Sequence, residues 1–209
     1  MTEAPEQPQL YLITPPGPTL SSLLDEVSKV MDAADIACVR MTTGTDDKDD
    51  IARAADLLRH ACHDRDVPLL IDNHPGLVGP LGLDGIHLKA SAKALREARE
   101  LLPEDSILGT YAGTSRHDGL TAGEIGADYV SFGPVGETGL GDVEHAQLEL
   151  FEWWSMMIEL PVIAEGGITL DLASTCAPYV DFIALGSELW RAETPATEIT
   201  RYAERLANG

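Results

Sequence analysis

Residues 161–169 read Pro-Val-Ile-Ala-Glu-Gly-Gly-Ile-Thr, and residues 180–187 read Val-Asp-Phe-Ile-Ala-Leu-Gly-Ser. Each stretch is a short apolar run rich in β-branched residues that stops at glycine and gives way to a helical pattern. Two strand-to-helix units therefore follow each other directly. The rest of the chain repeats this alternation.

Six more units precede these two. The predicted strands cover 9–14, 35–41, 67–71, 85–88, 106–111, 128–132, 161–165 and 180–185, and the predicted helices include 47–62, 91–102, 117–125, 144–158 and a last one over 187–206. Eight such units are what a closed parallel barrel requires, so we expect a single (β/α)8 TIM barrel over residues 9–209. A doubly wound sheet is the alternative, but no GxGxxG follows the first strand. Residues 1–8 form an acidic tail that we expect to be disordered.

The two glycine turns predict a phosphate site. Gly166 and Gly167 allow a ligand to approach the backbone closely, and Gly186 with Ser187 repeats the arrangement one unit later. Turns of this kind at the last two units of a (β/α)8 barrel bind phosphate. The alternative is that these glycines only make tight turns.

Composition limits the partners of the chain. A net charge of −21 over 209 residues argues against nucleic acid and against a membrane surface. A phosphorylated substrate must therefore be held by local donors or by a metal. No signal peptide is visible and no apolar run approaches the roughly 20 residues of a membrane span, so we expect a cytoplasmic protein. The three cysteines are widely spaced and are predicted to be reduced and buried.

Polar residues stand where the predicted strands end, which is the active end of such a barrel. Arg40 could hold a phosphate with its guanidinium or form a salt bridge to Asp72 or Glu165. Asp72 and Asn73 offer oxygen ligands suited to magnesium carried in with a diphosphate, although Asp72 or Asn73 could instead cap the next helix. His87 could donate a proton or be an inward-facing histidine with satisfied hydrogen bonds. Glu165 could act as a base or simply pair with Arg40.

Five segments resemble the thiamine-phosphate synthase superfamily, which also contains thiazole tautomerases. They are Ile-Asp-Asn-His (71–74), Leu-Asp-Gly-Ile-His-Leu (83–88), Gly-Ala-Asp-Tyr-Val-Ser-Phe-Gly-Pro-Val (126–135), Pro-Val-Ile-Ala-Glu-Gly-Gly-Ile (161–168) and Ile-Ala-Leu-Gly-Ser (183–187). The resemblance implies an enzyme that joins a hydroxymethylpyrimidine diphosphate to a thiazole phosphate, releases pyrophosphate and uses Mg²⁺. It implies that the glycine turns bind the thiazole phosphate, that Arg40, Asn73 and Thr138 bind the diphosphate, and that Asp72 binds the metal.

The diphosphate half departs from the family pattern. The family's Arg-x-Lys is here Arg40-Met41-Thr42, and its Asn-Asp pair is reversed as Asp72-Asn73. The second metal-binding aspartate falls near Ser91-Ala92, where there is no acid, and Thr138-Gly-Leu-Gly141 lacks the family's lysine. Two cations and one metal ligand are thus missing from the part that would bind a diphosphate.

Three functions are consistent with glycine turns that are retained and diphosphate contacts that are partly missing. The first is a synthase, divergent or weakened, with Arg40, His87 and Glu165 in the catalytic centre. The second is a tautomerase-like isomerase with Glu165 or His87 as acid/base, although the histidine that branch uses after the fifth strand is absent. The third is a barrel that binds a phosphorylated heterocycle or a partner protein without catalysis. The segment 153–157, with Trp153, Trp154, Met156 and Met157, could form a homodimer face or line the core.

Overall fold

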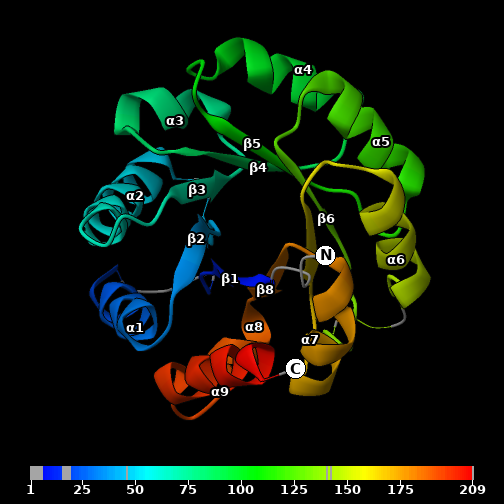
Figure 1. Cartoon of the computed structure of the whole chain (residues 1–209). Helices are drawn as coiled ribbons and strands as arrows, with labels where there is room; N and C mark the ends of the chain where they lie inside the picture. Colours follow the sequence, from blue (N-terminus) through cyan, green and yellow to red (C-terminus); the bar gives the residue numbers. More distant parts are fainter. Residues whose placement is uncertain (1–6, 16–19, 46, 140, 142, 209) are drawn as a thin grey trace.

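Eight parallel strands pair in chain order and close into a barrel, with β8 bonded to β1 (Figure 1). The computed structural model describes residues 7–15, 20–45, 47–139, 141 and 143–208. The predicted (β/α)8 fold is confirmed. Residues 1–6 of the predicted tail and residues 140 and 142 of the glycine-rich loop lie outside the described residues.

The elements alternate along the chain. The strands are β1 (Gln9–Ile13), β2 (Ile36–Met41), β3 (Leu69–Asp72), β4 (Gly85–Lys89), β5 (Ile107–Tyr111), β6 (Tyr129–Phe132), β7 (Val162–Glu165) and β8 (Phe182–Leu185). The helices are α1 (Leu20–Ala33), α2 (Lys48–His63), α3 (Pro75–Leu81), α4 (Ala92–Leu101), α5 (Arg116–Ile125), α6 (Leu148–Met157), α7 (Leu170–Cys176), the short 3-10 helix η1 (Ala177–Tyr179), α8 (Ser187–Trp190) and α9 (Pro195–Ala207).

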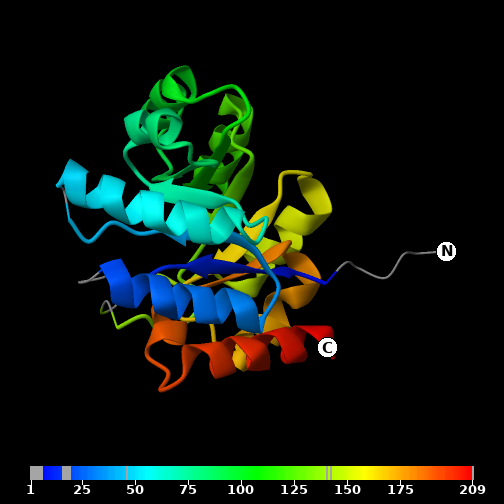
Figure 2. The same ribbon diagram turned by 90° about the vertical axis from the view of Figure 1, so that its left-hand side faces the viewer.

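The helices form an outer ring around the strands, and α9 closes it by packing beside α1 (Figures 1 and 2). In the part of the chain that the structure describes, no helix is both long and apolar enough to cross a membrane. The three cysteines are buried and unpaired, as predicted.

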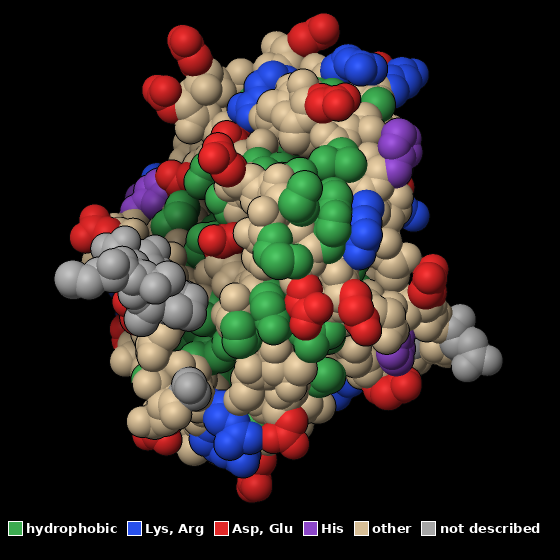
Figure 3. Space-filling model, turned by 45° about the vertical axis from the view of Figure 1, so that its right-hand side comes forward, with side chains coloured by type: hydrophobic (Ala, Val, Ile, Leu, Met, Phe, Trp, Pro, Cys, Tyr) green, Lys and Arg blue, Asp and Glu red, His purple; other side chains and the backbone are tan. Residues whose placement is uncertain are grey.

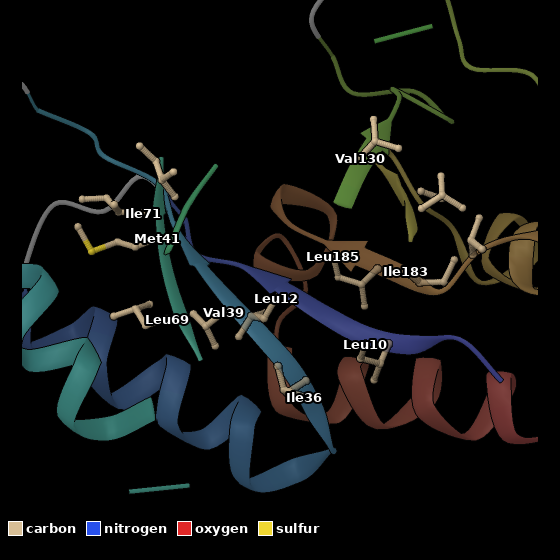
Figure 4. Packing of buried hydrophobic residues seen from close by; sticks show 14 of the residues in the cluster. Leu10, Leu12, Ile36, Val39, Met41, Leu69, Ile71, Val130, Ile183 and Leu185 are labelled. Atoms are coloured by element: carbon tan, nitrogen blue, oxygen red, sulfur yellow. The ribbon is translucent and has the colours of Figure 1, made fainter. Parts of the chain in front are cut away.

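Alternate residues of each strand face opposite sides, because side chains in a strand repeat with a period of two. Leu10 and Leu12 point outward into the layer between strands and helices, where Figure 4 shows them with residues such as Val39. Tyr11 lies between them in sequence and faces the barrel interior, where it packs with residues such as Leu70. The apolar core therefore surrounds the barrel, and the interior is left for a second set of residues.

Two predicted helix ranges were wrong. The last helix is broken into α8 and α9, because Thr194 is extended at φ −135° and ψ 90° directly before Pro195, and proline disfavours helical backbone in the residue that precedes it. Helix α6 begins at Leu148 rather than at 144, since Ala146 donates its N–H to the carbonyl of Pro134 and so joins the loop after β6.

The aromatic and methionine residues of α6 divide between core and surface. Trp154 is 1% exposed, whereas Met156 and Met157 are 75% and 64% exposed. Figure 3 shows hydrophobic side chains gathered on the side of the molecule that carries α5, α6 and α7. A homodimer through this side stays a prediction.

Gly109 should not tolerate a larger side chain. It lies between His87 and Tyr129 in the strand register, and a Cβ there would overlap the Tyr129 ring. That ring cannot turn away freely, because its hydroxyl is hydrogen-bonded to both Tyr11 and His87. We expect Gly109→Ala to lower the free energy of unfolding by about 1–3 kcal/mol in urea titrations. Gly76→Ala, where nothing lies within 4 Å of the added methyl, is the matched control and should be near neutral.

Candidate active site

Arg40 is the centre of a buried charge cluster at the carboxyl ends of the strands. Its Nη1 donates to Glu165 Oε2 at 2.8 Å, and its Nε lies 3.2 Å from Asp72 Oδ1. The three residues come from the ends of β2, β3 and β7, which a parallel barrel brings to one mouth. The salt bridges that the sequence left open as an alternative for Arg40 are therefore both present.

Burial and neighbouring charges shift the pKa values of Arg40 and Asp72. Burial alone would lower the pKa of Arg40, but Glu165 and Asp72 outweigh it and raise that pKa, so the guanidinium stays charged. Burial raises the pKa of Asp72 to about 6, with Glu165 adding to the shift and Arg40 opposing it. One cation thus faces two acids, and the mouth carries no surplus positive charge when Asp72 is ionised.

Below Arg40, a line of hydrogen bonds runs into the barrel interior. Arg40 Nη1 lies 3.0 Å from His87 Nε2, His87 Nδ1 lies 2.8 Å from the Tyr129 hydroxyl, and Tyr129 lies 2.8 Å from the Tyr11 hydroxyl. Since a guanidinium can only donate, His87 Nε2 is the acceptor and Nδ1 carries the proton that is donated to Tyr129. Both ring nitrogens are therefore engaged, as expected for an inward-facing histidine with satisfied bonds.

His87 is expected to stay neutral over the physiological range. Burial, and then the charge of Arg40, lower its pKa well below 6.5. Because the unfolded chain takes up this proton below about pH 6.5 and the folded chain does not, His87 lowers folding stability as the pH falls through that value. We predict a neutral Nδ1–H tautomer in ¹⁵N NMR spectra, unchanged from about pH 8 to about pH 5. Spectra of His87→Gln identify the signal, and a midpoint near pH 6.5 would contradict this arrangement.

The glycine turn after β7 has the geometry expected of an anion site. Gly166 and Gly167 have φ values of 84° and 68°, the left-handed region that favours glycine. A Cβ on Gly167 would meet the backbone of Gly136, so the turn packs directly on the loop after β6. A cavity of about 380 Å³ lies beside this turn and is lined by Glu165, Gly166, Gly186 and Ser187 among others.

A second cavity, of about 470 Å³, shares Glu165 and Gly166 with the first. Tyr111 and Thr138 also line it, and the Tyr111 hydroxyl donates to the carbonyl of Gly133 at 2.5 Å. The two cavities thus meet at Glu165, beside Arg40. A larger surface groove of about 670 Å³ is lined by residues of α7 and α9 and lies outside this arrangement.

Several buried polar atoms at the mouth have no hydrogen-bond partner among the described residues. They are Arg40 Nε, Asp72 Oδ1, Thr138 Oγ1 and Glu188 Oε1. Buried polar atoms are normally paired, so such a group at one place is typical of a site that a ligand completes. Arg40 Nε and Asp72 Oδ1 lie 3.2 Å apart as an ion pair without hydrogen-bond geometry, so a cation such as Mg²⁺ would have to share this oxygen with the guanidinium.

The loop after β3 carries backbone strain. Asn73 and His74 both have positive φ, at 59° and 55°, and neither is glycine. Strained backbone of this kind gathers at functional sites. Neither Asp72 nor Asn73 caps α3, whose N-cap is His74 without a side-chain bond. Asn73 is exposed at the rim, one residue beyond the Asp72 carboxylate.

The structure brings most of the predicted site residues to one end of the barrel. Tyr11, Tyr129 and Glu188 were missed as members of the site. Tyr11 and Tyr129 occupy positions that the period-two pattern directs inward. A tyrosine at such a position is a sequence signal for a polar group inside the barrel. Glu188 directly follows the predicted phosphate turn, and an acid there is the signal that could have identified it.

Comparisons with known proteins agree with this arrangement. Residues 10–189 match the family model for thiamine monophosphate synthase. The thiamine-phosphate synthase of Rhodospirillum centenum is 36% identical over 87% of this chain and 89% of its own length. That of Erythrobacter litoralis is 32% identical over 99% of both chains.

A solved structure shares the fold. Thiamine phosphate pyrophosphorylase from Pyrococcus furiosus superposes with a TM-score of 0.84 at 23% identity, over 96% of both chains. The family model covers most of the 209 residues, including every strand from β2 to β8 and the charge cluster at the mouth. The chain therefore belongs to the thiamine monophosphate synthase family.

Proposed function

We propose that this protein is a thiamine-phosphate synthase. It joins a hydroxymethylpyrimidine diphosphate to a thiazole phosphate and releases pyrophosphate. The observation that carries the proposal is the pair of cavities that meet beside Arg40, one along the glycine turns and one along Tyr111 and Thr138. Two adjoining cavities fit a reaction between two substrates better than they fit an isomerase with one.

We assign the thiazole phosphate to the cavity along Gly166, Gly186 and Ser187. Backbone N–H groups at such turns bind phosphate, and Arg191, which lines the same cavity, adds one cationic side chain in a chain with a net charge of −21. The glycine-rich loop after β6 lies against the same turn, since Val135 and Gly136 donate their N–H groups to the carbonyl of Gly166. The loop that lines the second cavity and the phosphate turn are therefore held as one unit.

We assign the diphosphate to Arg40 and the second cavity. The described contacts of Arg40 use Nη1 and Nε, which leaves Nη2 for a diphosphate oxygen. The unpaired hydroxyl of Thr138 could donate to the same group, and Asn73 stands at the rim. Glu165 and His87 hold the guanidinium in place, so we give both positioning roles.

Asp72 would hold Mg²⁺ carried in with the diphosphate. Its Oδ1 is buried, lies 3.2 Å from Arg40 Nε as an ion pair and makes no hydrogen bond among the described residues, so Mg²⁺ would share this oxygen with the guanidinium. Among these residues no cluster of three or more acidic, histidine or cysteine side chains could hold a metal by itself. Mg²⁺ bound there would neutralise charge on the leaving diphosphate, which a mouth with one cation and two acids needs.

The chemistry then depends on orientation and charge. The bond between the pyrimidine methylene carbon and the diphosphate oxygen breaks, and the thiazole nitrogen supplies the electron pair of the new bond to that carbon. Arg40 stabilises the negative charge that gathers on the leaving oxygen. Substrates bound on either side of the shared boundary at Glu165 and Gly166 would lie side by side, which would supply the proximity that such a transfer needs.

Thermal unfolding with single ligands tests the assignment. We expect pyrophosphate with Mg²⁺ to raise the melting temperature, and thiazole phosphate to raise it independently. Asp72→Asn should lose the response to Mg²⁺ with pyrophosphate and keep the response to thiazole phosphate. Stabilisation by thiazole phosphate alone in the unsubstituted protein would instead support a tautomerase-like enzyme or a non-catalytic binder.

A further inference from the structure

Glu188 places a carboxylate in the cavity that we assign to the substrate phosphate. It is the second residue of α8, and it lines that cavity together with Gly166, Gly186 and Ser187. Glu188 Oε2 lies 3.9 Å from the position that a Cβ on Gly186 would take. The side chain therefore turns back over the glycine turn after β8 instead of pointing into solvent.

The electrostatics of Glu188 agree with its position over the glycine turn. Burial raises the pKa of Glu188, and the backbone N–H groups of Glu188 itself, Gly186 and Ile168 oppose that shift. Gly186 belongs to the turn after β8, and Ile168 follows the glycine pair after β7. One oxygen, Oε1, is buried without a hydrogen-bond partner among the described residues, so the cradle is occupied but incompletely satisfied.

We propose that the Glu188 carboxylate is an internal competitor for the phosphate group of the substrate. In the substrate-free protein it occupies the cradle formed by the backbone at Ile168 and Gly186, and the incoming phosphate must displace it. This inference rests on the proposed function, because it takes these two turns as the phosphate site. Glu188 then sets the affinity and the selectivity of the site for the phosphorylated substrate.

The physical reason is charge. Two anions cannot share one set of N–H donors, because like charges in a partly buried cavity repel strongly. Glu165 lines the same cavity and adds to this repulsion, while Arg191 is the cationic side chain among the described lining residues. The carboxylate must swing out of the cradle before a phosphate can bind, and the free energy of that step weakens phosphate binding.

Titration calorimetry with inorganic phosphate tests the proposal without requiring turnover. We expect Glu188→Gln to bind phosphate about tenfold or more tightly than the unsubstituted protein. Glu188→Ala should bind at least as tightly, because it also empties the cradle. Glu159→Gln removes one acid from an exposed position after α6 and is the control for net charge. Its affinity for phosphate should stay unchanged.

Steady-state kinetics separate competition from a general structural effect. For the Glu188 variants we expect the KM for thiazole phosphate to fall and the KM for the pyrimidine diphosphate to stay constant. In the unsubstituted protein, the ¹³C signal of the Glu188 carboxyl should shift when phosphate is added, which tests the displacement even if a variant does not fold.

Equal phosphate affinity in all variants would overturn the competitor role and leave the proposed function intact. Tighter phosphate binding in the Glu188 variants without any thiamine phosphate formation would support the competitor role and contradict the proposed function. Absence of phosphate binding in every variant would remove the phosphate site on which both depend.

Discussion

Arg40→Met is expected to lower kcat/KM for thiamine phosphate formation by about 10²–10³-fold, because it removes the cationic side chain that we assign to the leaving diphosphate. The same change leaves Glu165 and Asp72 facing each other without their shared partner. Arg40 and Glu165 are only 7% and 9% exposed, so solvent does little to relieve the Glu165 charge. Loss of one partner of a buried ion pair costs roughly 3–5 kcal/mol of folding stability, and melting curves should therefore shift as well.

Two further variants separate the catalytic effect from the structural one. Arg40→Met combined with Glu165→Gln removes an unpaired carboxylate and should recover part of the stability without recovering activity. Arg40→Lys keeps a positive charge but cannot reach Glu165, Asp72 and His87 at once, so we expect intermediate activity. Recovery of full activity in the double variant would contradict the role of Arg40.

Gly167→Ala is expected to be the most damaging change in the phosphate turn. A Cβ there would overlap the backbone carbonyl of Gly136, and the residue already has a φ of 68°. The backbone cannot move aside as the end of a side chain can. Steric overlap and left-handed strain should together lower the free energy of unfolding, measured in urea, by about 2–5 kcal/mol. Displacement of this turn should also weaken thiazole phosphate binding.

Gly126→Ala is the matched control for Gly167→Ala. Gly126 also has positive φ, at 99°, but nothing lies within 4 Å of an added Cβ. It should show backbone strain alone, about 1 kcal/mol, with normal ligand binding. If both variants lose the same stability and both bind thiazole phosphate normally, the close packing of the turn on the loop after β6 has no role in the site.

The barrel could be predicted because its signals are local. Apolar runs of strand length recur eight times and each marks a strand, and the three that are followed directly by Gly133, Gly166 and Gly186 also mark the start of a site loop. The charge cluster was predictable in outline for the same reason, since Arg40, Asp72 and Glu165 end their strands and strand ends share one mouth. The predicted alternatives for Arg40 and His87, a salt bridge and a satisfied inward histidine, both describe the structure.

The rest depended on tertiary placement. The link from His87 to Tyr129 exists because Gly109 between them has no side chain, and this register between three strands is not visible in any one of them. The direction of the Glu188 side chain depends on the cavity beneath it. The break before Pro195 was a local signal that the apolar pattern of the predicted 187–206 helix concealed.

The most direct test is formation of thiamine phosphate by the purified protein from hydroxymethylpyrimidine diphosphate and thiazole phosphate with Mg²⁺. We predict product well above a heat-inactivated control, loss of product when Mg²⁺ is chelated, and a strong decrease in Arg40→Met. Such a result would show that Arg40, Asp72 and Thr138 are sufficient without the family's lysines. Absence of product from a folded protein that binds both substrates would contradict the proposed synthase function.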